Sequence, residues 1–320
     1  MPETQNPKIL RPLTHELKDA TSPVRRFLDD RLATGLRAVQ SQYLKDMPPV
    51  RVPPGTANAG TVGTAADWLL RMLVHPTPSL AIPLRGAMAL DTTPGVELTP
   101  ALCSIAQVLE IPPPDPIVGV RTFAGPVAGN GAEPELLARA SWSLALLTEA
   151  FRAGPLRALQ GPLQRFKGET PSAEDLLELA PADALEQLTA FRRVYEESLL
   201  PHLAKRRGEW TIGPTFTGSR LMKADADLVT AGLLLELKTS SKKPALSRGD
   251  AFQLIGYALL DFNNAYRLDA VALFSARYGH LAVWPLSQLL DELSGRPVDL
   301  LELREEFRSL LIAHHPQRSA

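Results

Sequence analysis

The chain has 320 residues, 45% of them hydrophobic, and its 34 Lys and Arg nearly balance its 35 Asp and Glu, so the net charge of −1 does not by itself indicate a nucleic-acid partner. The single cysteine, Cys103, excludes an internal disulfide and a four-cysteine iron–sulfur cluster. The sequence contains neither a membrane-length apolar run nor a basic-then-apolar leader, so a cytoplasmic protein without membrane contact is expected.

The first predicted segment, residues 1–58, combines one helix with a proline-rich connector. The helix is predicted from Pro23 to Leu44, because Ser22 can cap it and proline suits its first turn. Residues 47–60 contain several prolines and are predicted to form a loop.

The second predicted segment, residues 59–208, is mostly helical. Its first helix covers an apolar stretch that ends at Val74, for which Thr64 is a suitable N-cap with Asp67 at the third helical position. The Gly and Thr residues of this stretch could also cradle a phosphate, but such a loop is not specific. Residues 76–135 are rich in Pro, Gly and Thr and indicate no chemistry. Further helices are predicted over residues 135–151, 173–179 and 182–200.

The third predicted segment, residues 209–286, begins with β-strands. One strand is predicted over residues 210–217. The residues of the next strand alternate strictly, so that Asp225 and Asp227 share one face. The opposite face of that strand carries Ala224, Ala226 and Leu228.

A two-residue turn at Ala231-Gly232 is predicted to join this strand to the next as a hairpin, because hairpins favour this length and Gly supplies a positive φ. The resulting register pairs Thr230 with Leu233, Leu228 with Leu235, Asp227 with Glu236, and Asp225 with Lys238. Cross-strand partners share a face with Cβ atoms about 5 Å apart, so three carboxylates and one ammonium are predicted to meet.

This polar cluster has two interpretations. In one, the hairpin lies at a sheet edge with a solvated charged face, on which Lys238 partly neutralises Asp225. In the other, the carboxylates bind a divalent cation, since Mg²⁺ takes oxygen ligands from one or two carboxylates and completes its shell with water and phosphate. Unpaired carboxylates are costly to bury, which favours the metal site.

A helix is predicted after the hairpin. Ser247 is suited to cap this helix with Asp250 at the third position. Gln253 and Tyr257 share one helical face because they are four residues apart. An amphipathic helix with two incidental polar residues is the alternative interpretation.

Together these residues resemble a known family. Asp227 and the tripeptide Glu236-Leu237-Lys238 resemble the D…(D/E)xK signature of the PD-(D/E)XK nuclease superfamily, and Gln253 with Tyr257 resembles the QxxxY motif of its RecB-like branch. The tripeptide alone occurs in many proteins. The resemblance therefore depends on the combination of the aspartate strand, the strand end and the following helix.

The remaining predicted elements are strands over residues 268–276 and 280–284, a helix capped by Ser287 and a last helix over 297–314, the helices forming a fourth segment, 287–320. From residue 182 the predicted order is one helix, three strands, one helix and two strands, which is a mixed α+β class. The resemblance implies a restriction-endonuclease-like α-β-β-β-α-β core within residues 209–286, preceded by a large helical N-terminal part.

Two acids compete for a further place at the site. The stretch GTAADWLL resembles the Gly-x-x-His-x-x-Leu segment of RecB-like nuclease domains, with Asp67 in place of the histidine that reaches the metal. Aspartate is a suitable ligand for Mg²⁺ or Mn²⁺, so Asp67 is either a metal ligand or a helix cap. Glu196, beside the apolar stripe of the 182–200 helix, is the rival, with a solvated salt-bridging glutamate as the alternative.

The resemblance implies a nuclease that hydrolyses phosphodiester bonds with Mg²⁺ or Mn²⁺, with DNA favoured over RNA, in defence or repair. In this interpretation Asp227 and Glu236 bind the metal, and Asp225 or Asp67 completes its shell. Lys238 orients the attacking water or stabilises the phosphate oxygens.

Gln253 and Tyr257 are then expected to fix the lysine and the phosphate that is cut. Two alternatives remain open. One is a nucleic-acid-binding module without turnover. The other is a nuclease subunit that acts beside a helicase or ATPase partner, because the chain has no GxxxxGK(S/T) phosphate loop of its own.

Overall fold

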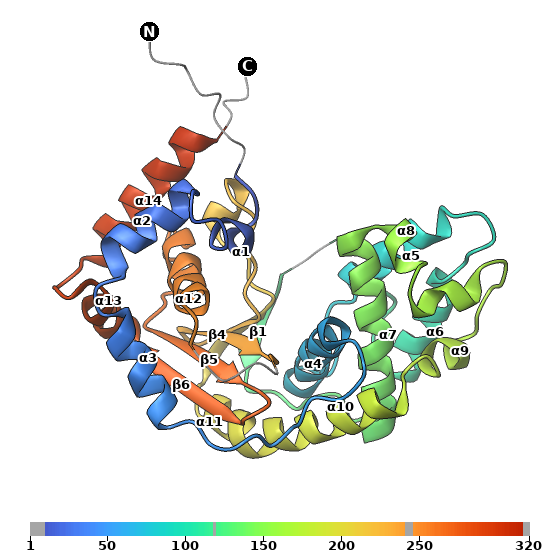
Figure 1. The fold of residues 1–320 in the computed structure, drawn as a ribbon. Coiled ribbons are helices and arrows are strands. Elements are labelled where there is room, and N and C mark those ends of the chain that lie inside the picture. The colour runs from blue at the N-terminus through green and yellow to red at the C-terminus, as the bar shows by residue number, and fades with distance from the viewer. Residues whose placement is uncertain (1–9, 118–119, 241–245, 316–320) are drawn as a thin grey trace, which may run out of the picture.

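A six-stranded mixed sheet forms the centre of the fold (Figure 1). The computed structural model describes residues 10–117, 120–240 and 246–315. The strands lie side by side in chain order: β1 (Arg121–Gly125), β2 (Gly208–Ile212), β3 (Leu228–Thr230), β4 (Leu233–Lys238), β5 (Ala270–Ser275) and β6 (His280–Pro285). Neighbouring strands are antiparallel except β4 and β5, which are parallel. A crossover connection must therefore join β4 to β5.

The two faces of the sheet contribute to separate hydrophobic cores. Leu234 and Val271 belong to one core, whereas their chain neighbours Leu235 and Ala272 belong to the other. This alternation follows from the two-residue period of side chains along a strand.

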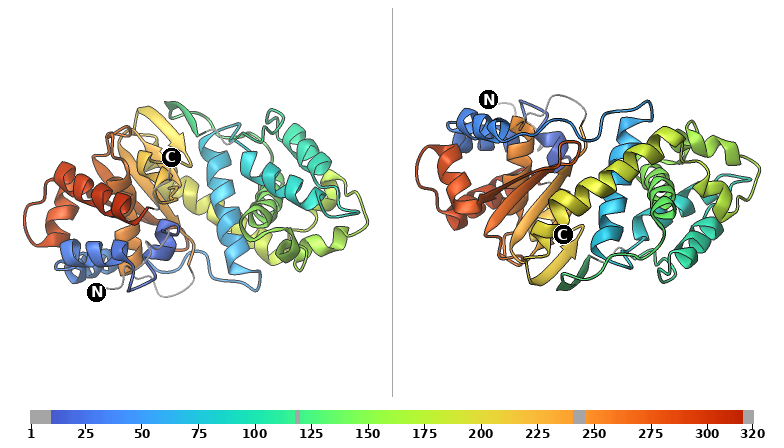
Figure 2. Two further views of the ribbon diagram at one scale, coloured as in Figure 1. Left: turned by 90° about the horizontal axis from the view of Figure 1, so that it is seen from above. Right: turned by 90° about the horizontal axis from the view of Figure 1, so that it is seen from below.

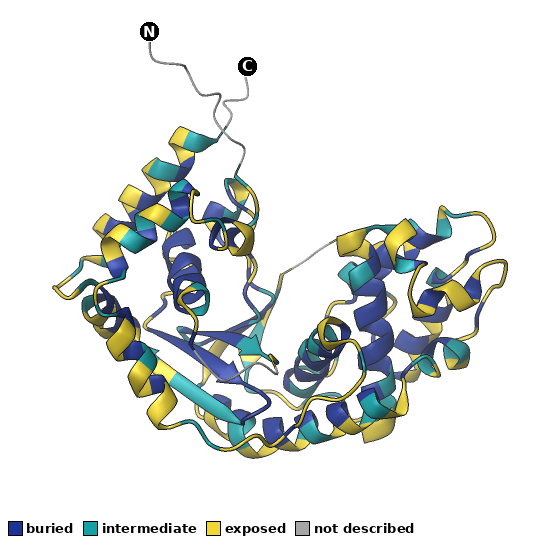
Figure 3. Cartoon of the chain, in the orientation of Figure 1, coloured by how far each residue is buried: buried dark blue, intermediate teal, exposed yellow. Residues whose placement is uncertain are grey.

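Helices from both ends of the chain cover the first core, and Figure 1 shows them together in blue and in orange to red. They are α1 (Leu13–Glu16), α2 (Pro23–Leu32), α3 (Leu36–Lys45), α12 (Arg248–Leu260), α13 (Leu286–Ser294) and α14 (Leu300–His314). The crossover helix between β4 and β5 is α12, and it is buried along its length from Ala251 to Leu260 (Figure 3).

Helices from the middle of the chain form the second core with the other face of the sheet (Figure 2). They are α4 (Ala59–Val74), α5 (Ala81–Asp91), α6 (Thr99–Val108), α7 (Pro134–Ala153), α8 (Pro155–Ala158), α9 (Ala173–Leu177), α10 (Ala182–Val194) and α11 (Leu200–Leu203). Shorter turns are 3₁₀ helices at Pro162–Phe166 and Thr217–Arg220 and a π-helical turn at Tyr195–Leu199 between α10 and α11.

The prediction of a single helix from Pro23 to Leu44 is wrong in one respect, because this segment forms two helices, α2 and α3. Ser22 caps α2 as predicted. The break lies at Gly35, whose N–H donates to the carbonyl oxygen of Leu293 on α13 at 2.9 Å. A Cβ at this position would lie 1.7 Å from the carbonyl oxygen of Glu292. α13 approaches closely at this break, and Gly35, a residue typical of helix ends, permits the approach.

The predicted cap of α4 is also wrong. Asn58 caps this helix, and its side chain accepts hydrogen bonds from the N–H groups of Gly60 and Thr61. Thr64 lies inside the helix, where its hydroxyl donates to the Gly60 carbonyl at 3.3 Å. Asp67 is consequently two turns from the helix start and cannot act as a capping residue.

The predicted order from residue 182 is confirmed: α10, β2, β3, β4, α12, β5 and β6 follow one another along the chain. The strand predicted over 210–217 ends earlier, at Ile212, and α13 begins after Pro285 rather than with a Ser287 cap. The region 76–135, for which no element was predicted, contains α5, α6 and β1. A proline in the first turn of α5 and of α6, and the five-residue length of β1, hide these elements from a periodicity argument.

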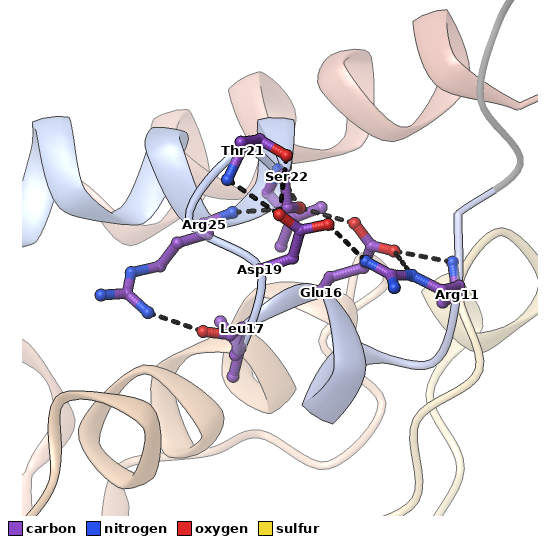
Figure 4. A network of polar contacts seen from close by, with 8 residues as sticks. Arg11, Glu16, Leu17, Asp19, Thr21, Ser22 and Arg25 are labelled. Carbon is purple, nitrogen blue, oxygen red and sulfur yellow. Dashed lines mark hydrogen bonds and ion pairs between the residues drawn. The ribbon is translucent and has the colours of Figure 1, made fainter.

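A polar network fixes the N-terminal helices to each other (Figure 4). Glu16 is buried, and its carboxylate accepts hydrogen bonds from the backbone N–H and the guanidinium of Arg11 at 2.9 and 3.0 Å. The hydroxyl of Ser22 donates to the other carboxylate oxygen at 2.6 Å while it caps α2. Burial acts to raise the pKa of Glu16, but these hydrogen bonds outweigh it and lower the pKa.

Within the described residues, the helices are too short or too polar for any one of them to cross a bilayer.

Candidate active site

The hairpin of β3 and β4 has the predicted turn and the predicted pairing next to it. Ala231 and Gly232 both have positive φ angles, 44° and 85°, as a two-residue hairpin turn requires. Thr230 pairs with Leu233, and Leu228 pairs with Leu235.

The ladder ends at Leu228, so the predicted pairs of Asp227 with Glu236 and Asp225 with Lys238 are wrong. On the edge that faces away from β4, residues 225–227 continue the β2–β3 pairing: the Gly213 N–H donates to the Asp227 carbonyl at 3.0 Å, and Asp225 forms a bridge with Thr215. The predicted alternation also breaks here, because Ala224 and Ala226 pack in the core of α12 and Leu228 in the opposite core.

The Asp227 carboxylate nevertheless reaches β4. It accepts a hydrogen bond from the Leu237 backbone N–H at 2.6 Å, where the ladder has ended. Burial, then the negative charges of Glu236 and Asp67, raise the pKa of Asp227 well above its ordinary value. The Leu237 hydrogen bond and the charge of Arg71 oppose this shift without cancelling it. Asp227 is therefore within electrostatic range of two other carboxylates.

Glu236 on β4 is 6% exposed and lies against α12. Its Oε1 accepts hydrogen bonds from Gln253 Nε2 at 2.7 Å and from Lys238 Nζ at 3.1 Å. Its Oε2 is buried without a hydrogen-bond partner in the part of the chain that the structure describes. Burial is the main reason that the pKa of Glu236 is raised, although Lys238 acts against it.

Lys238 ends β4 and is surrounded by acceptors. Its Nζ lies 2.8 Å from Gln253 Oε1, 3.1 Å from Glu236 Oε1 and 3.5 Å from Asp250 Oδ1. Burial acts to lower its pKa, but the charges of Glu236 and Asp250 outweigh burial and raise the pKa. Lys238 therefore carries its positive charge at neutral pH.

The α12 helix supplies the residues that orient this lysine. Ser247 and Asp250 form the predicted capping box at its start. Gln253 Nε2 donates to Glu236 and also to the hydroxyl of Tyr257 at 2.6 Å, while its Oε1 accepts from Lys238. Tyr257 is buried, and burial followed by the charge of Glu236 strongly raises its pKa, so it stays a neutral phenol.

Asp67 reaches the same place from α4, whereas Glu196 does not. Asp67 Oδ2 pairs with Arg71 Nε at 2.8 Å, and its Oδ1 is buried with no hydrogen-bond partner in the described residues. The charge of Asp67 contributes to the raised pKa of both Asp227 and Glu236. Glu196 is 44% exposed and pairs with Arg192 at 2.7 Å, as a surface salt bridge.

The donor set at this place fits a divalent cation. Among the described residues no three His, Cys, Asp or Glu side chains form a ready metal-ligand group. Two buried carboxylate oxygens, Asp67 Oδ1 and Glu236 Oε2, have no partner, and such atoms are costly without one. Mg²⁺ is satisfied with one or two carboxylates when water and phosphate complete its shell. Two of the carboxylates of Asp227, Glu236 and Asp67 could hold it with water and phosphate, while Asp225 is exposed at the edge of the group.

Two residues of this group were not predicted to contribute to the site. Asp250 was expected only to cap α12, yet it also lies beside Lys238. Arg71 was not considered, although its i,i+4 spacing from Asp67 is a signal for an ion pair on one helical face. The position of both relative to the strands depends on packing between distant segments.

Comparison of the chain with protein-family models, with curated proteins and with solved structures gave no match. The interpretation of the site therefore depends on its own residues.

Proposed function

We propose that the protein is a metal-dependent nuclease that hydrolyses phosphodiester bonds, with DNA favoured over RNA. One observation carries the proposal: the Lys238 ammonium is held by Glu236 and Gln253 next to a group of carboxylates that have unpaired, buried oxygens. A lysine fixed beside acids of this kind suits a reaction in which negative charge develops on a phosphate.

In this proposal Asp227 and Glu236 hold Mg²⁺ or Mn²⁺, with Asp67 as the third acid and Asp225 at the edge. Such an ion supplies activation of water and neutralisation of charge on the phosphate. Lys238 orients the attacking water or donates to a phosphate oxygen. Gln253 binds Glu236, Tyr257 and Lys238 at once, so it keeps the lysine in place before substrate arrives.

The element order supports the proposal. The run α10-β2-β3-β4-α12-β5 has the α-β-β-β-α-β order of a restriction-endonuclease-like core, and the strand that bears Glu236 and Lys238 is parallel to β5. Glu236 and Lys238 lie on β4, Gln253 and Tyr257 lie on α12, and Asp227 directly precedes β3, which supports the proposed PD-(D/E)XK resemblance. A cytoplasmic location and a role in defence or repair are part of the same proposal.

Two other functions are distinguishable from this one. A nucleic-acid-binding module without turnover would bind DNA and leave it intact. A nuclease subunit of a helicase or ATPase complex would cut only beside its partner. The intact pair of Glu236 and Lys238 favours turnover by the chain itself, since a binding module needs neither.

Incubation of the purified chain with linear, circular and single-stranded DNA and with RNA tests the proposal, each with Mg²⁺, Mn²⁺ or EDTA. Cleavage that depends on the metal and is lost in EDTA is expected. Calorimetry with Mn²⁺ should show an ion that Glu236→Gln no longer binds and that Glu196→Gln still binds. Normal DNA binding without cleavage under every metal would exclude turnover by the isolated chain.

A further inference from the structure

Arg71 on α4 is anchored at one edge only. Its Nε pairs with Asp67 Oδ2 at 2.8 Å, and its guanidinium carbon lies 5.4 Å from the centre of the Trp68 ring. These two contacts fix the plane of the guanidinium. The side chain is 18% exposed, so it lies at the border between the core and solvent.

The other edge of the guanidinium is open. Within the described residues, Nη1 and Nη2 of Arg71 have no hydrogen-bond partner. The backbone passes close to this edge at Gly213, where a Cβ would lie 3.1 Å from Nη1. Gly213 also has a φ of 59°, so glycine both permits the turn and leaves the space beside the guanidinium free.

This open edge lies beside the acids of the candidate site. Gly213, which faces Nη1, donates its N–H to the Asp227 carbonyl at 3.0 Å, so this edge adjoins the segment that carries Asp227 and Asp225. Only Asp67 among these acids forms an ion pair with Arg71. If Arg71 served solely to hold Asp67, its Nη1 and Nη2 would not need to be left without partners next to a group of carboxylates.

We propose that Arg71 is a phosphate-binding residue: Nε holds Asp67, and Nη1 and Nη2 bind the oxygens of a backbone phosphate of the nucleic acid. This inference rests on the proposed nuclease function and adds a substrate contact that the motif residues do not supply. The planar fork of arginine matches two phosphate oxygens, whereas a lysine offers a point charge.

The salt dependence of DNA binding tests this contact. Anisotropy of a labelled duplex and a labelled single strand is measured over a range of salt concentrations, in EDTA and again with Ca²⁺. Each lost phosphate contact reduces the slope of log affinity against log salt by about 0.9 for duplex and about 0.7 for single strands. Arg71→Gln should show this loss in one or both probes.

Arg139→Gln is the matched control, because Arg139 forms the same kind of i,i+4 ion pair with Glu135 on α7. The DNA affinity of this variant should depend on salt concentration in the same way as that of the unmodified protein. Arg71→Lys keeps the charge, so it still tests the contact if Arg71→Gln does not fold. It should retain the slope but bind several-fold more weakly, since the second hydrogen bond of the fork is lost.

The outcomes separate the two proposals. If the unmodified protein cuts and binds DNA, and both Arg71 variants bind with its affinity and slope, the phosphate contact is wrong and the nuclease function stands. If the unmodified protein neither binds nor cuts any nucleic acid, the proposed function fails and the contact fails with it.

Discussion

At the scale of single residues, burial and neighbouring charges together set the pKa values of the acids in the candidate site. Burial and neighbouring acids raise the pKa of Asp227 and Glu236, which means that their ionised forms are strained without a cation. Lys238 relieves this strain only at Glu236 Oε1. The remaining unpaired oxygen of Glu236 is therefore the feature that most needs a partner.

Lys238→Ala should lower the cleavage rate by about 10²–10³, the usual cost of one preorganised electrostatic donor. The variant should fold, because Lys238 contributes no buried apolar group and is 27% exposed. Metal binding should persist, since a competing positive charge is removed. Rates of DNA degradation and thermal unfolding measure these effects, with the exposed Lys167→Ala as control. Equal cleavage by both variants would show that the activity belongs to another site or to a contaminant.

At the scale of elements, the site is formed where α4 and α12 meet the ends of β3 and β4. The α12 helix follows β4 directly along the chain, so its residues reach Glu236 and Lys238 over a short connection. The α4 helix comes from a distant segment and is held partly by the Tyr195 hydroxyl, which donates to the Ala66 carbonyl at 3.2 Å. This contact lies next to Asp67 in the chain.

Asp67→Asn should cost much more nuclease activity than Glu196→Gln. The reason is position: Asp67 lies among the acids, whereas Glu196 is in an exposed pair that contributes little. Initial cleavage rates of the two variants at saturating Mg²⁺ provide the comparison. The opposite ranking would assign the helical acid to the π-helical turn after α10, and two small effects would make both acids structural.

The junction of α2 and α3 gives a stability prediction at the same scale. Gly35→Ala should destabilise the protein by about 1–3 kcal/mol, because the new methyl would meet the backbone of α13 and force the helices apart. Gly131→Ala is a control, since nothing lies within 4 Å of the Cβ position there. Chemical denaturation of both variants measures the difference. A neutral Gly35→Ala would mean that α13 can move away from this junction at little cost.

At the scale of the whole molecule, the first and the last described helices are packed together on one face of the sheet (Figure 1). The α1 and α2 helices contact α12, α13 and α14, so the first helices support the element that carries Gln253 and Tyr257. The Glu16 network fixes α1 to the start of α2 (Figure 4). Loss of that network should therefore be felt as a loss of global stability.

Glu16→Gln should destabilise the protein by about 1–3 kcal/mol at neutral pH, the cost of a charged hydrogen-bond network left incomplete. Because the folded pKa of Glu16 is lowered, its contribution is present above the unfolded value of about 4.3 and is lost as the pH falls through the folded pKa. Thermal unfolding at a series of pH values should show the difference from the unmodified protein shrinking below about pH 4. A difference that stays constant down to acidic pH would rule out a contribution from the ionised carboxylate.

Local rules were enough for the features that depend on neighbouring residues. The Ala231-Gly232 turn, the Leu228–Leu235 pair, the Ser247 capping box and the shared face of Gln253 and Tyr257 follow from periodicity and capping chemistry, and the structure has them. Each depends on contacts within a few residues or on a register that one turn sets.

The tertiary structure decided what depends on segments far apart in the chain. Asp227 lies beyond the end of the β3–β4 ladder, and its carboxylate rather than its backbone contacts β4, at the Leu237 N–H. Asp67 joins the acids because α4 packs against the sheet, and the break between α2 and α3 lies where α13 approaches Gly35. Such contacts are fixed by the packing of whole elements, whose energy is shared over many side chains and leaves no pattern at any one position of the sequence.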